Sequence, residues 1–173
     1  MRLFIGQKVE VCSKQKEFRG SYYEATVIKY EFSPSSTIIT YHVQYRNLIE
    51  EDSDNPLVEK VSADEIRPIP PPKPPCPSPS KYPDFEMFEG VDVFENEGWW
   101  SGQITGRHGR DRFFVCFPPT GEKLDYHHKL DYHHKLDYHH SQLRHHLDWT
   151  NRNWISQSEA FMCFGSEGSL CET

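Results

Sequence analysis

The sequence of 173 residues lacks the features that mark membrane, disulfide-rich and nucleic-acid-binding proteins. No stretch approaches the roughly eighteen apolar residues of a membrane span, and the amino terminus has no signal-peptide core. The five cysteines are an odd number without C-x-x-C spacing, so they indicate neither a disulfide framework nor a zinc cluster. The net charge of −7 disfavours nucleic acid as the main ligand, because such a ligand needs a basic face. We therefore expect a soluble intracellular protein with no membrane contact and a basic partner.

Motifs for catalysis and for metal binding are also missing. The chain has no Gly-rich phosphate loop before a helix, no nucleophile elbow and no acid pair in a recognisable motif. Eight of the ten histidines lie between His127 and His146, but adjacent His-His pairs on a strand point to opposite faces, and no cysteine completes a tetrahedral set. We predict that the chain is not an enzyme, uses no cofactor and has no native metal site.

An internal repeat organises the sequence. Each copy contains two adjacent aromatic residues followed by a β-branched run, and alternation predicts Tyr23, Ala25 and Val27 on one face of a strand with Tyr22 on the other. The matching segments are 6–12 with 90–94 (two residues fewer), 20–27 with 97–104, 41–45 with 113–117 and 63–68 with 140–145. Each unit holds four or five short strands in about sixty residues, which is typical of a small, strongly bent antiparallel barrel.

The repeat also predicts the domain organisation. We expect a first barrel over 1–67, a Pro-rich linker over 68–84, a second barrel over 85–154 and a tail over 155–173. Nine prolines in 68–83 favour an extended spacer. The hexapeptide Lys-Leu-Asp-Tyr-His-His occurs three times in 123–140, and a period of six preserves which side chains face the same way. We expect this insertion to protrude as a hairpin or loop without disturbing the barrel.

These motifs resemble the tandem Agenet proteins of plants, a Tudor-like branch of the Royal family of histone readers. The motifs are Gly6-x-x-Val9-Glu10-Val11, 18–27, Pro56-Leu57-Val58-Glu59, Ile66-Arg67-Pro68 and Gly98-Trp99-Trp100-x-Gly102. The resemblance implies an all-β fold in which two Tudor-like (Agenet) small β-barrels pack as a tandem unit. It also implies a nuclear chromatin protein, monomeric as this chain, that binds the histone H3 N-terminal tail dimethylated on lysine 9 (H3K9me2) in heterochromatin and in gene or transposon silencing.

Aromatic residues occupy the places where a Tudor-type barrel builds a methyl-lysine cage. In the first unit the expected cage residues are Phe18, Tyr22, Tyr23 and Tyr45, and the expected acidic contacts to the peptide are Glu50, Asp52 and Asp54. In the second unit Phe94, Trp99, Trp100 and Phe117 form either a second cage or the filling of the seam between barrels. An aromatic face attracts a methylated ammonium by roughly 0.5–2 kcal/mol.

The same aromatic residues could instead close the two small barrels. The alternative function is then a constitutive protein- or RNA-interaction module that does not depend on methyl-lysine. The two readings differ in one property, since only a reader gains affinity with each relevant methyl group.

Overall fold

The computed structural model describes residues 3–12, 14–15, 18–32, 39–72, 85–117 and 136–156. The first unit contains β1 (Lys8–Val11), β2 (Ser21–Phe32), β3 (Ile39–Ile49), β4 (Pro56–Ser62), the 3-10 turn η2 (Ala63–Glu65) and β5 (Ile66–Pro68). The second contains β6 (Gly90–Glu95), β7 (Gly98–His108), β8 (Arg112–Cys116), β9 (Leu136–His139), the 3-10 turn η4 (His140–Gln142) and β10 (Leu143–His145). A hairpin of β11 (Leu147–Thr150) and β12 (Asn153–Ser156) follows. No helix among the described residues has the length and hydrophobicity that a membrane span requires.

The first unit is a strongly bent antiparallel sheet closed around an apolar core. β2 pairs with β1 and β3, β3 pairs with β4, and β5 returns to the outer edge of β1. Tyr23, Ala25 and Val27 are all buried, as the alternation of the strand predicts. A bulge between Val27 and Lys29 bends β2 and shifts its register against β3.

The second unit repeats this arrangement. β7 pairs with β6 and β8, β8 pairs with β9, and β10 returns to β6. The turn before each first strand is also repeated, because Gly6 donates to the carbonyl of Val27 at 2.7 Å and Phe88 donates to that of Ile104 at 2.9 Å. Phe88 therefore corresponds to Gly6 and takes the same left-handed backbone, with φ of 66° against 87°. Matching Gly90 to Gly6 in the sequence predicts two residues fewer in the second copy. This expectation is wrong, because Phe88 and not Gly90 takes the place of Gly6.

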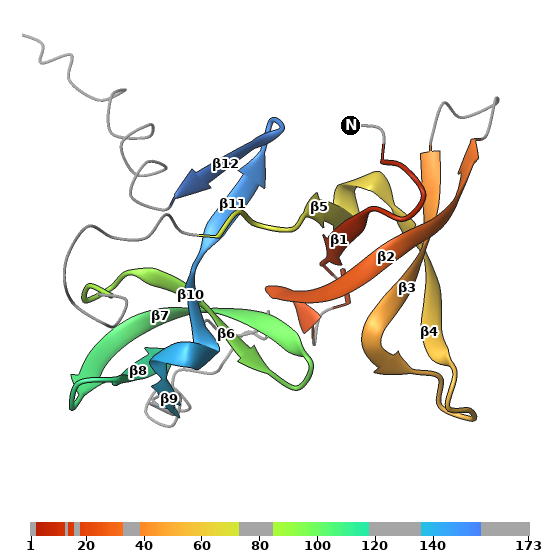
Figure 1. The fold of residues 1–173 in the computed structure, drawn as a ribbon. Helices are drawn as coiled ribbons and strands as arrows, with labels where there is room; N and C mark the ends of the chain where they lie inside the picture. Colours follow the sequence, from red (N-terminus) through yellow and green to blue (C-terminus); the bar gives the residue numbers. More distant parts are fainter. Residues whose placement is uncertain are drawn as a thin grey trace, which may run out of the picture.

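The two units are joined by a direct strand pairing between β2 and β7. Tyr22 lies opposite Trp99, and Ser21 lies opposite Trp100, in antiparallel register. Since Tyr22 and Trp99 are counterparts in the repeat, the pairing has an approximate two-fold axis between them. Figure 1 shows β2 reaching from the first unit to the second. The fold is all-β, with two small barrels packed as a tandem unit.

A buried charge network lies on this axis, in the seam between the two barrels. Glu10 and Arg67 are paired on β1 and β5, and their counterparts Asp92 and Arg144 are paired on β6 and β10. Both carboxylates are fully buried. Each arginine contacts the carboxylate of the other unit as well, because Arg144 Nη1 lies 2.6 Å from Glu10 Oε1 and Arg67 Nη2 lies 3.5 Å from Asp92 Oδ2. The network therefore ties the two barrels together electrostatically.

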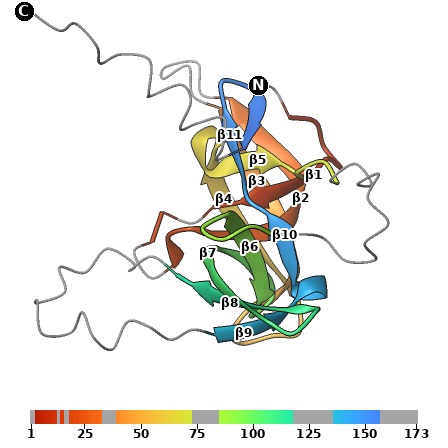
Figure 2. The same cartoon turned by 90° about the vertical axis from the view of Figure 1, so that its left-hand side faces the viewer.

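The hairpin β11–β12 covers one side of the seam. Figures 1 and 2 show it beside β5, where Arg67 Nη1 donates to the carbonyl of Leu147 at 2.9 Å. The rings of Trp149 and Trp154 are 5.0 Å apart, and the Arg67 guanidinium lies 5.4 Å from the Trp154 ring. The hairpin extends to Ser156, beyond the predicted start of the tail. The remaining tail, linker residues 73–84 and insertion residues 123–135 lie outside the described residues.

Candidate functional site

An aromatic cluster stands where the two units meet. Phe18, Tyr23 and Trp100 form a triangle in which all three ring centroids are 6.4 Å apart. Tyr45 lies edge-on to Tyr23, also at 6.4 Å. Phe18 keeps 39 % of its surface exposed, whereas Tyr23 and Tyr45 are buried. The first unit supplies three of the rings, and Trp100 comes from the second unit.

Hydrogen bonds hold two of these rings in place. The Tyr45 hydroxyl donates to Glu59 Oε2 at 2.6 Å, and Trp100 Nε1 donates to the carbonyl of Glu95 at 3.0 Å. Burial, together with the Glu59 carboxylate, raises the pKa of Tyr45 above its usual range. Burial also raises the pKa of Tyr23, partly offset by a hydrogen bond with Ser21. Both phenols therefore stay neutral, and the rings are positioned before any ligand arrives.

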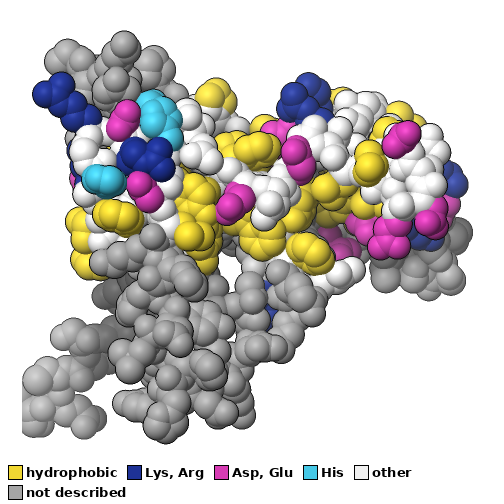
Figure 3. Space-filling model, turned by 90° about the horizontal axis from the view of Figure 1, so that it is seen from below, with side chains coloured by type: hydrophobic (Ala, Val, Ile, Leu, Met, Phe, Trp, Pro, Cys, Tyr) yellow, Lys and Arg dark blue, Asp and Glu magenta, His cyan; other side chains and the backbone are white. Residues whose placement is uncertain are grey.

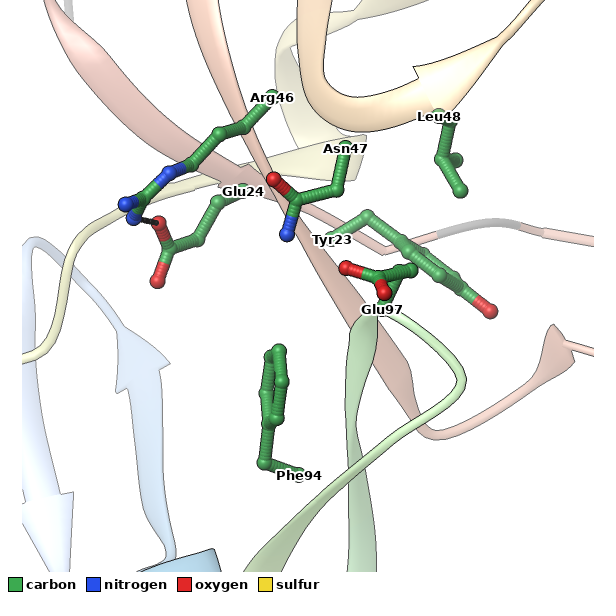
Figure 4. A pocket seen from close by; sticks show the side chains of 7 residues that line it. All are labelled: Tyr23, Glu24, Arg46, Asn47, Leu48, Phe94 and Glu97. Atoms are coloured by element: carbon green, nitrogen blue, oxygen red, sulfur yellow. Dashed lines mark hydrogen bonds and ion pairs between the residues drawn. The ribbon is translucent and has the colours of Figure 1, made fainter.

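A cleft of about 140 Å³ adjoins the cluster along the side of Tyr23. Figure 4 shows its lining, which consists of Tyr23, Glu24, Arg46, Asn47, Leu48, Phe94 and Glu97. Arg46 Nη1 is 2.7 Å from Glu24 Oε2, and Arg46 is the single cation among the lining residues, whereas Glu24 and Glu97 supply two carboxylates. The cleft is therefore acidic, with apolar walls from β2, β3 and β6.

The β6–β7 turn brings the second unit against this cleft. Asn96 and Glu97 both have positive φ, 48° and 61°, which is the backbone of a type I′ turn between Glu95 and Gly98. Gly98 follows without a side chain, and a Cβ there would lie 2.7 Å from Cε1 of Tyr23. The turn can approach Tyr23 this closely only because position 98 is glycine.

The structure brings together three of the four residues expected in the first cage. Phe18, Tyr23 and Tyr45 meet in the cluster, but Tyr22 points to the opposite face of β2. There the Arg67 guanidinium lies 3.2 Å from the centroid of the Tyr22 ring, and burial raises the pKa of Tyr22 to about 12. Tyr22 is thus part of the seam.

The aromatic residues expected in a second cage or seam are distributed over three places. Trp100 joins the first cluster. Trp99 lies under the guanidinium of Arg144 at 4.1 Å, as Tyr22 lies under Arg67, and therefore fills the seam. Phe94 lines the cleft at 5.0 Å from Trp99. Phe117 is edge-on to Tyr138 at 6.1 Å in the second barrel.

The acidic residues expected beside the cage lie in the connection between β3 and β4. Glu50, Asp52 and Asp54 are exposed, and the Glu50 carboxylate accepts a hydrogen bond from Ser53 at 2.8 Å within the same connection. None of the three lines the cleft. They remain predicted contacts for parts of a ligand that extend beyond it.

Sequence reasoning missed the carboxylates nearest the cluster. Glu24 and Glu97 line the cleft, and Glu59 orients Tyr45. Alternation puts Glu24 on the face of β2 opposite to Tyr23, so the strand pattern gave no signal that both would line one cleft. Figure 3 shows apolar side chains gathered between the two units with acidic side chains among them.

Comparison with known proteins agrees with this architecture. Residues 6–71 match the Agenet domain family. The chain is 32 % identical over 152 residues to Protein AGENET DOMAIN (AGD)-CONTAINING P1 of Arabidopsis thaliana, and the match covers 88 % of this chain and 25 % of that protein. It is 29 % identical over 169 residues to DUF724 domain-containing protein 3 of the same plant, with coverages of 95 % and 21 %. The chain thus spans a quarter or less of the length of these two relatives.

Solved structures extend the similarity to both units. The crystal structure of Arabidopsis thaliana AGDP1 AGD34 superposes with a TM-score of 0.67 at 26 % identity, covering 88 % of each chain. The structure of ADCP1 tandem Agenet domain 3-4 gives a TM-score of 0.63 at 25 % identity, covering 88 % of this chain and 86 % of that one. Fold and site together define a tandem module of two Tudor-like barrels with an aromatic cluster at their junction. The chain belongs to the tandem Agenet proteins.

Proposed function

We propose that this module is a chromatin reader that binds a methylated lysine on a basic peptide, with Phe18, Tyr23 and Trp100 enclosing the methylammonium. The observation that carries the proposal is the triangle of ring centroids with equal sides of 6.4 Å. A cation above this triangle lies within about 6 Å of all three centroids at once, which is the range of cation–π attraction. Tyr45 packs edge-on against the Tyr23 wall.

The neighbouring cleft suits the rest of such a ligand. Histone tails are rich in lysine and arginine, and a cleft lined by Glu24 and Glu97 attracts them. Glu50, Asp52 and Asp54 extend the acidic surface along the β3–β4 connection, where further basic residues of the peptide are expected. The net charge of the chain, −7, favours the same partner.

The resemblance to plant tandem Agenet readers identifies the first ligand to test. It points to the histone H3 tail dimethylated on lysine 9, and with it to a nuclear location and a role in heterochromatin and silencing. A carboxylate beside the cage favours a dimethylated over a trimethylated lysine, because only the former keeps an N–H to donate.

Calorimetric titration with H3 peptides carrying zero, one, two or three methyl groups on lysine 9 tests the proposal. We expect affinity to rise at least about tenfold from the unmethylated to the dimethylated peptide, since two or three cation–π contacts contribute roughly 0.5–2 kcal/mol each. Replacing Phe18 by alanine should reduce this step and leave the affinity for unmethylated peptide nearly unchanged.

Tyr30 provides the matched control, because it is a tyrosine on the same strand as Tyr23 but lies on the exposed outer half of β2. Tyr30→Ala should keep the methyl-dependent step. Equal affinity of the wild-type chain for all four peptides would remove the reader proposal and favour a constitutive interaction module.

A further inference from the structure

The seam contains one group whose charge can change near neutral pH. His146, buried next to Asp92, directs Nδ1 to Asp92 Oδ1 at 2.5 Å and Nε2 to Asp148 Oδ1 at 3.3 Å. A neutral imidazole carries one N–H and can donate to only one of these carboxylates, whereas the imidazolium donates to both. Both hydrogen bonds from the ring to the carboxylates can therefore form only when His146 is protonated.

Charge counting leads to the same state. The seam and its neighbour contain three carboxylates, those of Glu10, Asp92 and Asp148, but only two guanidinium groups, those of Arg67 and Arg144. Protonated His146 brings the sum to zero. Glu10 and Asp92 are matched by the two guanidinium groups, so loss of that proton leaves the negative charge of half-exposed Asp148 uncompensated beside the seam.

Strand β7 connects this network to the proposed cage. Trp100 faces the cage, while the residues on either side of it face the seam. Trp99 stacks on Arg144 at 4.1 Å, and Ser101 Oγ lies 3.1 Å from Asp92 Oδ1 and 3.2 Å from His146 Nδ1. The Ser101 amide also donates to the carbonyl of Gly20 at 2.9 Å, which ties β7 to the segment that directly follows Phe18. Any change in how the units meet at the seam therefore moves Trp100 relative to the first-unit rings.

We propose that His146 is a positioning residue for the methyl-lysine site, and that its protonation, by closing the seam, tightens peptide binding. This inference rests on the proposed reader function and adds pH as a regulator of the same site. The groups that face His146 are Asp92 on β6, Ser101 on β7, Asp148 on β11 and Tyr22 on β2, whose ring centroid is 6.3 Å away. Arg67 on β5 opposes protonation through its charge, and the carboxylates outweigh it.

The direction of titration agrees with this geometry. Burial alone would lower the pKa of His146, but the hydrogen bond to Asp92 and the charges of Asp92 and Asp148 raise it above the usual value. A histidine with a raised folded-state pKa contributes stability that is fully present below the unfolded value of about 6.5 and is lost as pH rises through the folded value. Peptide affinity should decline over the same interval above pH 6.5.

The test compares affinity and His146 titration in the full chain. The probe is an amino-terminally acetylated H3 peptide with dimethylated lysine 9 and no histidine, titrated between pH 6 and pH 8.5. We expect affinity to fall about fivefold over this range, a coupling of ordinary size for linked sites. His146→Gln should flatten the profile. His42→Gln is the matched control, because His42 also pairs with a carboxylate, Glu31 at 3.1 Å, but sits on β3 away from the seam.

Protonation of His146 and peptide binding are thermodynamically linked, so the pKa of His146 is a second measurement. Bound peptide would not shift this pKa if His146 had a merely structural role. If protonation increases affinity fivefold, bound peptide must raise the pKa of His146 by about 0.7. Nuclear magnetic resonance titration of the His146 ring in the free and peptide-saturated protein measures this value, and the signal absent from His146→Gln identifies the residue. A methyl-dependent affinity that is the same at every pH, with a His146 pKa unmoved by peptide, would refute the inference and leave the reader function intact. Absence of methyl-dependent binding at every pH would refute both.

Discussion

Adding one methyl group at Gly98 should weaken the module in two measurable ways. Gly98 has an ordinary backbone conformation, so Gly98→Ala introduces no dihedral strain. Its Cβ would nevertheless lie 2.7 Å from Cε1 of Tyr23 and 3.0 Å from Cδ1 and Cζ, whereas ordinary contact begins at 3.4 Å. The Tyr23 ring is rigid, buried and packed on three other aromatic rings, so it cannot retreat without disturbing them.

The magnitude follows from this overlap. Overpacking by one methyl group typically costs about 1–3 kcal/mol, which a small domain survives but which should be visible in thermal or urea unfolding. Moving the Tyr23 ring away from the cage should cost a further cation–π contact, roughly 0.5–2 kcal/mol of methyl-peptide binding. The combined expectation is a folded protein with lowered stability and an affinity for dimethylated H3 peptide reduced several-fold.

Gly102→Ala is the control for this experiment. It lies on the same strand, and its Cβ would meet Cγ1 of Val115 at 2.5 Å, so the steric conflict is similar but lies in the core of the second barrel. Both variants should lose stability, while only Gly98→Ala should lose affinity when binding is measured by calorimetry at 10 °C, where both are folded. If Gly98→Ala binds as tightly as wild type, the assignment of Tyr23 to the cage is refuted.

Glu10→Gln should cost about 3–5 kcal/mol in urea unfolding, because it leaves the buried Arg67 and the partly buried Arg144 short of a carboxylate. A loss under about 1 kcal/mol would show that the seam does not hold the units together. Acid should weaken the fold through Asp92: burial would raise the pKa of this carboxyl, but His146, Arg144 and Arg67 lower it overall, so its contribution is present above about pH 4 and lost as pH falls through the folded value. Urea unfolding at pH 5 and pH 3 measures this, and Asp92→Asn should reduce the difference. Deleting 129–140 leaves one hexapeptide to form β9, so stability should change by only about 0.6 kcal/mol per halving of the preceding loop; a more than tenfold loss of peptide affinity would instead place the repeat in the site.

Alternation and repetition in the sequence predict much of the fold. Tyr23, Ala25 and Val27 follow the period of a strand, and their burial follows from it. The same period separates Tyr22 from Tyr23, since adjacent strand residues face opposite sides. Placing both in one cage conflicts with that rule, and the structure resolves the conflict by giving Tyr22 to the seam.

The junction was less predictable, because it depends on how two similar barrels dock. A repeat identifies Trp100 as the counterpart of Tyr23, but it contains no information about which strand of one unit pairs with which strand of the other. The β2–β7 register is what places Trp100 beside Phe18 and Tyr23. Likewise, the burial of Glu10 and Asp92 follows from docking, since in a single barrel each would lie on an outer face.

The approximate two-fold pairing of β2 with β7 has the form of a homodimer interface built into one polypeptide. In a true homodimer, every substitution appears twice, and both sides of the axis must accept it. Here Tyr22 and Trp99, or Gly98 and Ser21, occupy matching places with different side chains. Because the two halves are fused in one chain, each position can change alone. One side of the axis can then bind the ligand while the other side holds the two barrels together.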